Sequence, residues 1–110
     1  MNLFAVVLAA SAAFGTPSKI EKSLEPKKAH EECITLSPSE ELTYSFSSSS
    51  EVKFNLHYHV GKEVVYPVKL DKASSDKGTF KPTSKQDYCL MWANGSEKPV
   101  TVKYEFEVKK

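Results

Sequence analysis

The chain of 110 residues has few cysteines, no excess of either charge and no hydrophobic run long enough to cross a membrane. Its two cysteines allow at most one disulfide, which excludes a scaffold held together by several bridges. The chain has fifteen basic and fourteen acidic residues, and the resulting net charge of +1 gives no indication of a basic surface for nucleic acid. A chain of this length forms one domain, and its 11% aromatic content argues against disorder.

The motifs of the common enzyme classes are also absent. The sequence contains no Gly-x-Ser-x-Gly nucleophile elbow, phosphate-binding loop, His-Glu-x-x-His motif or dinucleotide fingerprint. Serine is abundant, but the run at residues 47–50 is more simply read as a loop. Asp71 and Asp76 border a polar stretch where acidic side chains are usually solvated. We therefore expect no enzymatic activity.

The first fifteen residues carry no charged side chain and contain an apolar run at residues 3–10. A membrane span needs about 20 apolar residues, so this run is too short to cross a bilayer. It resembles the apolar core of a secretory signal, and small residues suited to cleavage follow it. We predict a signal peptide at residues 1–15, with a buried helix or strand as the alternative. The mature protein, without a membrane span, is then secreted or periplasmic, or in the endoplasmic reticulum or extracellular in a eukaryote.

Residues 16–32 are rich in charge, contain two prolines and offer only Ile20 and Leu24 as apolar anchors. Such a segment buries too little apolar surface to offset the entropy lost when it becomes ordered. We therefore predict a flexible charged leader here. The alternatives are a short docked helical turn that ends before Pro26, and a segment that recruits a partner.

From Cys33 onward, apolar residues alternate with polar ones at a period of two, which indicates β-strands. The pattern predicts strands at residues 42–46, 52–60, 64–70, 87–93 and 100–108, a break at residues 47–50 and a polar loop at residues 71–77. Gly61-Lys62 and Asn94-Gly95 are turn signals. Residues 33–110 are therefore predicted to form an all-β domain, an antiparallel β-sandwich of about six to eight strands. A small closed barrel is the alternative.

The two cysteines are Cys33, at the start of the predicted domain, and Cys89, in its most apolar strand. Exported proteins enter an oxidising compartment, where paired thiols usually form a disulfide. Cys89 also lacks a Cys-x-x-Cys neighbour. We therefore predict a structural Cys33–Cys89 disulfide, with a reactive thiol or a metal ligand as the alternative.

His57 and His59 form a His-x-His pair in the predicted strand at residues 52–60. Side chains two residues apart on a strand project from the same face, so both imidazoles can bind one metal ion. Copper(II) or zinc suits imidazole ligands best. A specific site needs a third ligand, for which Asn55, His30 and Glu63 are candidates. The alternative is a solvated strand face that binds no cofactor.

Asn94-Gly95-Ser96 matches the acceptor sequence for N-glycosylation. If the source is a eukaryote, Asn94 is therefore a predicted glycosylation site. The same residues are already explained by the turn that Asn94 and Gly95 predict.

Several short motifs resemble the GOLD (Golgi dynamics) domain, a β-sandwich of cargo receptors in the early secretory pathway and of lipid-binding proteins. The matching residues are Glu32-Cys33, Tyr44 with Phe46, Val52 with Phe54, Gly78-Thr79-Phe80 and residues 88–94. The family's second cysteine position falls on Met91, whereas this chain has Cys89 on the same strand face. The resemblance covers residues 33–108.

The resemblance implies a binding or interaction module without naming a ligand. The sequence shows no coiled coil, membrane span or cytoplasmic sorting tail of a cargo receptor, so we expect a stand-alone exported form. Our first hypothesis is a non-enzymatic module that binds a protein or lipid partner through loops or an exposed edge strand. The second is a small metal-binding protein that uses His57 and His59.

Overall fold

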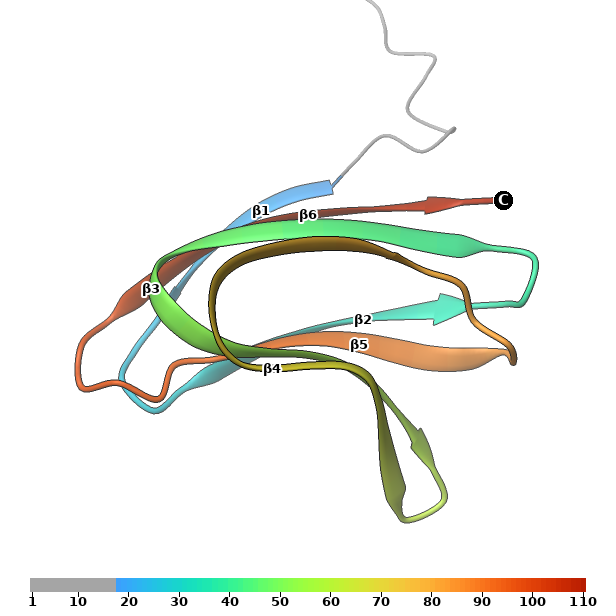
Figure 1. The fold of residues 1–110 in the computed structure, drawn as a ribbon, viewed down its shortest axis with the longest axis horizontal. Coiled ribbons are helices and arrows are strands. Elements are labelled where there is room, and N and C mark those ends of the chain that lie inside the picture. The colour runs from blue at the N-terminus through green and yellow to red at the C-terminus, as the bar shows by residue number, and fades with distance from the viewer. Residues whose placement is uncertain (1–17) are drawn as a thin grey trace, which may run out of the picture.

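The computed structural model describes residues 18–110, and the predicted signal peptide at residues 1–15 lies outside them. The described chain forms an antiparallel sheet of six strands without a helix (Figure 1). The strands are β1 (Ser18–Leu24), β2 (Ala29–Leu36), β3 (Glu41–Val60), β4 (Glu63–Phe80), β5 (Gln86–Ala93) and β6 (Val100–Lys109). Residues 18–110 contain no helix that is long and apolar enough to span a membrane.

The sheet folds into two layers because β3 and β4 are long enough to take part in both (Figure 1). The first half of β3 pairs with β6, and β1 continues this upper layer beside β6. The second half of β3 pairs with β5, and β2 continues this lower layer beside β5. β4 pairs with β3 in both layers. This arrangement confirms the predicted all-β, sandwich-like fold.

Two predicted interruptions of the strands are wrong. Residues 47–50 and residues 71–77 continue β3 and β4 around the bend between the layers. The pairing register of the two strands shifts between Ser47 and Val52. Such an irregularity bends a strand and increases its twist while the pairing continues. The polar residues at the bend are mostly exposed, which explains why their sequence resembles that of a loop.

The predicted flexible leader at residues 16–32 is wrong for residues 18–32, which form β1 and part of β2. β1 pairs with β6 over its whole length, and only Ile20 and Leu24 pack against the core. Backbone hydrogen bonds do not depend on the side chain, so an edge strand needs few apolar anchors. Within the described residues, the sandwich therefore begins at Ser18 rather than at Cys33.

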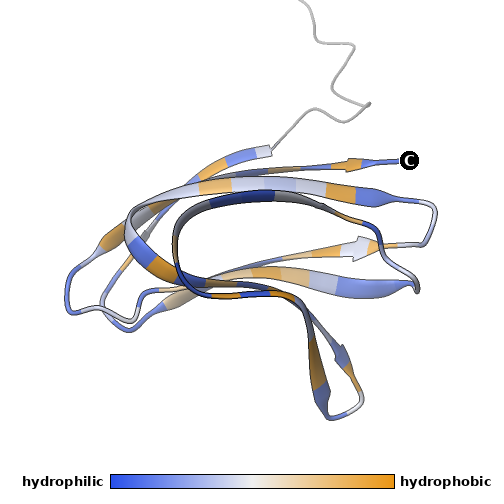
Figure 2. Ribbon diagram, viewed as in Figure 1, coloured by the Kyte–Doolittle hydropathy of each residue, from blue (hydrophilic) through white to orange (hydrophobic). Residues whose placement is uncertain are grey.

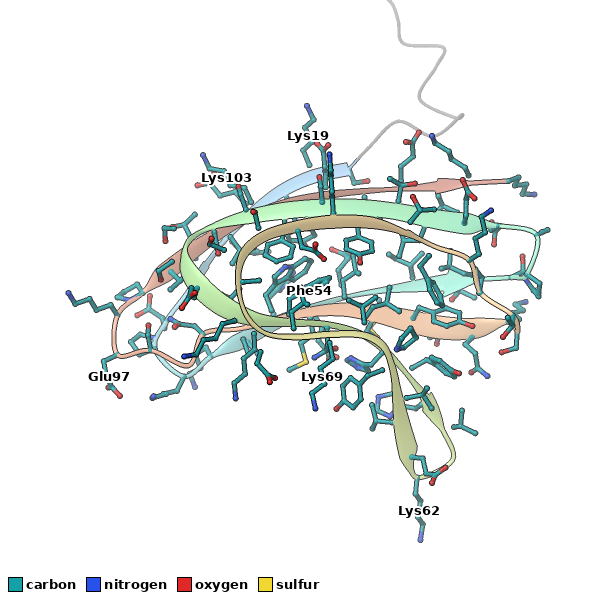
Figure 3. All side chains as sticks on the ribbon, in the orientation of Figure 1. Lys19, Phe54, Lys62, Lys69, Glu97 and Lys103 are labelled. Atoms are coloured by element: carbon teal, nitrogen blue, oxygen red, sulfur yellow. A yellow bond between two sulfur atoms is a disulfide. The ribbon has the colours of Figure 1, made fainter. Side chains whose placement is uncertain are left out.

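The hydrophobic core fills the space between the layers. Phe54 lies there between the upper and lower strands (Figure 3). The Trp92 ring is stacked on Tyr104 of the opposite layer, with ring centroids 4.2 Å apart. Hydrophobic and hydrophilic residues alternate along the strands, which directs one face of each layer inward and leaves the other for solvent (Figure 2). Functional side chains are therefore found on the outer faces and the loops.

The last part of β3 and the first part of β4 project from the sandwich as a hairpin (Figure 1). Pairing between β3 and β5 ends at His57, so within the described residues only β4 accompanies the rest of β3. Gly61 has a φ of 61°, a left-handed conformation that suits glycine in a tight hairpin turn. The predicted turn at Gly61 and Lys62 is confirmed, and Lys62 lies at its tip (Figure 3).

Candidate functional site

The predicted disulfide lies on the outer face of the lower layer. Cys33 of β2 and Cys89 of β5 are direct partners in the antiparallel register, and their sulfur atoms are bonded. Tyr88 and Leu90 face the core, so Cys89 between them faces outward. The bridge joins the edge strand β2 to the middle of this layer and is the staple that a small core needs.

His57 lies on the same outer face, yet only 5% of its surface is exposed. Its Nδ1 is 2.6 Å from Oδ1 of Asn55, and its Nε2 is 3.1 Å from a carboxylate oxygen of Glu31. Both ring nitrogens therefore face an oxygen atom. Glu31 reaches His57 from β2, across the intervening β5.

The predicted metal ligands are not brought together as one set. The rings of His57 and His59 are 5.4 Å apart, but the contacts of His57 are with Asn55 and Glu31. Of the other candidates, His30 faces the interior, where it bonds to Tyr104. Glu63 lies at the turn of the hairpin.

The described residues do contain one close group of metal-ligating types, namely Glu31, Cys33 and Cys89. The two cysteines form the disulfide, so neither sulfur is a thiolate that can bind a metal ion. Metal binding by His57 and His59 stays a prediction.

Two residues that the sequence reasoning did not select complete the surroundings of these histidines. Tyr66 of β4 lies beside His57, with ring centroids 5.9 Å apart. The Nζ atom of Lys69 lies over the ring of Tyr66, 5.0 Å from its centroid. Figure 3 shows Lys69 on the outer side of the lower layer. We call His57, His59, Tyr66 and Lys69 the histidine–tyrosine cluster.

The projecting hairpin carries the most exposed large hydrophobic side chains of residues 18–110. These are Val60 (49% exposed), Val64 (39%), Val65 (37%) and Tyr66 (45%). Hydrophobic residues continue along the hairpin toward its end in Figure 2. We call Val60, Val64, Val65 and Tyr66 the apolar hairpin patch; Val64, the register partner of His59, lies on the face of the histidines, whereas Val60 and Val65 lie on the other face of the hairpin. It adjoins the histidine–tyrosine cluster through Tyr66, which belongs to both.

The outer face of the upper layer has a different character. It contains two shallow depressions of about 520 and 480 Å³ in volume, with Ser45 and Glu105 lining both. Lys19 and Glu105 form an ion pair on this face, with 4.0 Å between the charged atoms. Lys19 and Lys103 point outward from this layer in Figure 3. Such paired charges are typical of a solvated surface.

A polar network crosses the core between the layers. The hydroxyl group of Tyr104 donates to Glu32 over 2.7 Å and therefore accepts from Nε2 of His30 over 2.8 Å. Burial raises the pKa of the Tyr104 hydroxyl well above its usual range, and the hydrogen bond to Glu32 raises it further. The network connects β6 in the upper layer to β2 in the lower one, so its role is readily explained as structural.

Asn94, the predicted glycosylation site, is only 1% exposed. Its Nδ2 donates to the carbonyl oxygens of Leu24, Glu25 and Lys98 over 2.8–3.3 Å. A glycan is attached through this same nitrogen, and its bulk would displace these bonds. The folded structure therefore disfavours glycosylation, and Asn94 instead holds the β1–β2 turn against the β5–β6 loop.

Comparison with known proteins defines the fold and not the family, because no protein-family model and no curated protein matches the chain. The chain is similar to the Yersinia pseudotuberculosis-derived mitogen, with 14% identity, a TM-score of 0.63 and 86% of each chain covered. It is also similar to Aeromonas hydrophila PliG, a periplasmic inhibitor of g-type lysozyme. That match has 10% identity, a TM-score of 0.62 and covers 94% of this chain and 93% of PliG.

A de novo designed double-stranded β-helix gives a further match, with 14% identity and a TM-score of 0.50, over 82% of this chain and 99% of the design. All three likenesses are at or below 14% identity, so they show a shared β-fold alone. The finer resemblance to GOLD domains has no support from a family match.

Proposed function

We propose that this chain is an exported, non-enzymatic β-sandwich that binds a protein partner through its apolar hairpin patch. The observation that carries the proposal is the exposure of Val60, Val64, Val65 and Tyr66, four large apolar side chains on one projecting element. Clustered apolar exposure of this kind marks interaction sites, whereas single exposed apolar residues are common everywhere. Tyrosine is also enriched at the centres of protein interfaces.

The solved structures of similar fold support a binding role. One is a mitogen and one is an inhibitor of g-type lysozyme. An inhibitor of an enzyme acts by contact with a protein, and the fold is therefore suited to that task. The GOLD resemblance implies the same class of function, a binding module.

Export is supported by three features. Disulfides persist in oxidising compartments and are rare in the cytosol, and Cys33 and Cys89 form one. Residues 1–15 carry the pattern of a secretory signal. The PliG inhibitor of similar fold is periplasmic. We therefore propose secretion or export to the periplasm.

The experiment compares three forms of the chain lacking residues 1–15. The hairpin variant is Val60→Ser/Val64→Ser, and the control is Lys77→Ser/Thr79→Ser. The control residues are also exposed on β4, but they lie in the upper layer. Each form is immobilised and exposed to extract of the native compartment, and a retained protein is then purified and titrated by calorimetry.

We expect the wild type and the control to bind the purified partner equally. The hairpin variant should bind about tenfold more weakly or worse, because the loss of central apolar contacts is costly at an interface. Equal affinity of all three forms would refute the role of the hairpin. Sedimentation with lipid vesicles tests the alternative partner, and hairpin-dependent vesicle binding would replace the protein proposal with a lipid one.

A further inference from the structure

The ammonium group of Lys69 has an unusual position beside the apolar hairpin patch. Its Nζ lies 5.0 Å from the centroid of the Tyr66 ring, on the outer face of the lower layer. Within residues 18–110, no carboxylate forms an ion pair with Lys69. An aromatic ring attracts a cation and holds it over the ring face, but leaves the N–H groups free to donate.

The other polar groups in and around the histidine–tyrosine cluster differ in whether they already have a partner within the described chain. Glu31, whose carboxylate reaches this face, is engaged with His57. The imidazole of His59 and the hydroxyl of Tyr66 make no side-chain hydrogen bond within the described chain, and both side chains are exposed. Glu31 is thus occupied, while three groups able to donate remain on one surface: Lys69, His59 and Tyr66.

We propose that this surface binds a carboxylate of the protein partner, an aspartate or glutamate set within an apolar surface. The inference rests on the proposed function and adds the chemistry of the partner. Val64 and Tyr66 of the apolar hairpin patch, on the same face as His59, would cover the surroundings of that carboxylate, and Lys69 would supply the opposite charge. Exclusion of water strengthens a charge-assisted hydrogen bond, so the apolar and cationic parts act together.

The alternatives for this surface fit the contacts less well. A basic partner group would meet the like charge of Lys69, and the Glu31 carboxylate is already engaged with His57. A purely apolar partner surface would leave the Lys69 ammonium group covered without an acceptor, which is costly. An acidic group embedded in apolar surface satisfies both parts of the site.

The test uses two short peptides as probes, each acetylated at the N-terminus and amidated at the C-terminus. Their sequences are Val-Leu-Glu-Phe-Val and Val-Leu-Gln-Phe-Val, which differ only in the charge of the central side chain. Each is titrated into the ¹⁵N-labelled chain lacking residues 1–15, and the shifts of its amide signals are followed by NMR. The same titrations are made with Lys69→Gln and with Lys103→Gln, a control on the opposite face of the sandwich.

We expect the glutamate peptide to shift the amide signals of His59, Tyr66 and Lys69 and to bind about tenfold more tightly than the glutamine peptide. This preference should disappear in Lys69→Gln and persist in Lys103→Gln. Equal binding of the two peptides, shifts confined to other surfaces, or no saturation by the glutamate peptide at millimolar concentration would each overturn the proposal.

Failure of this proposal can be told apart from failure of the proposed function. If Val60→Ser/Val64→Ser loses a purified partner while Lys69→Gln binds it as the wild type does, the hairpin is the binding element and the carboxylate is not recognised. If neither variant changes the affinity, both proposals are wrong.

Discussion

Removal of the Cys33–Cys89 disulfide should destabilise the fold mainly through the unfolded chain. The bridge closes a loop with a sequence separation of 56 residues. In the chain-entropy model, a loop of that length contributes about 4 kcal/mol to the free energy of unfolding. Small domains have total stabilities of roughly 5–15 kcal/mol, so Cys33→Ala/Cys89→Ala should lose a large part of the whole.

The folded state itself should change little in this variant. Cys33 and Cys89 are already opposite each other in the β2–β5 ladder, and the backbone register holds them there without the bridge. The assay is urea unfolding followed by tryptophan fluorescence, because Trp92 is the only tryptophan and is buried in the core. The matched control is Met91→Ala, which removes an apolar side chain from the same strand face without changing connectivity.

The slope of the unfolding free energy against urea distinguishes the two causes of destabilisation. Without the bridge, the unfolded chain is less constrained and exposes more surface, so the slope should rise as the stability falls. Met91→Ala should lower the stability and leave the slope unchanged. A loss below about 1 kcal/mol in Cys33→Ala/Cys89→Ala, with an unchanged slope, would refute this reasoning.

Three further predictions concern pH, a buried amide and metals. The free energy of unfolding should fall as pH rises above about 10, because the unfolded chain then loses phenolic protons that the folded state retains at Tyr104 and, through burial, at Tyr44. Denaturation across that range should give a shallower fall for Tyr104→Phe, and identical slopes would contradict the assignment. Asn94→Ala should lose about 2 kcal/mol in urea unfolding, because three carbonyl groups lose their donor; wild-type stability would exclude this role. Copper(II) and zinc should bind the wild type and His57→Ala/His59→Ala equally weakly in calorimetry, because both nitrogens of His57 already have partners; a tight site lost in the variant would instead establish the metal prediction.

Strands whose side chains face one apolar and one polar environment were predictable from the period of two. The alternation at residues 52–60 and 100–108 lies within β3 and β6. The edge strand β1 was not predictable from this period, because five of its seven residues are exposed and only two contact the core. Its order comes from pairing with β6, and a backbone partner distant in sequence leaves no local signal. The same reason explains why the polar bend of β3 resembled a loop.

The candidate site was predicted only in part. The disulfide followed from the count of cysteines and the expected compartment, and His57 and His59 were recognised as a pair on one face. Glu31 was missed because its segment was interpreted as unstructured, although pairing with β5 brings it to His57. The sequence gives no signal for the exposure of Val64 either. An exposed valine on a projecting hairpin and a core valine in a sandwich occur in the same alternating pattern.

The sequence by itself determined the fold class and the single disulfide, because these depend on local alternation, on composition and on counts. Only the tertiary structure decided which side chains share each outer face. It showed that pairing of β3 with β5 ends at His57 and leaves the hairpin unsupported, with its apolar residues exposed. It also placed Lys69 over Tyr66 and Glu31 against His57, contacts between strands that no local pattern encodes. Few cysteines and a balanced charge excluded a scaffold of several bridges and a basic surface for nucleic acid, whereas the exposed hairpin is the site that we propose for a partner.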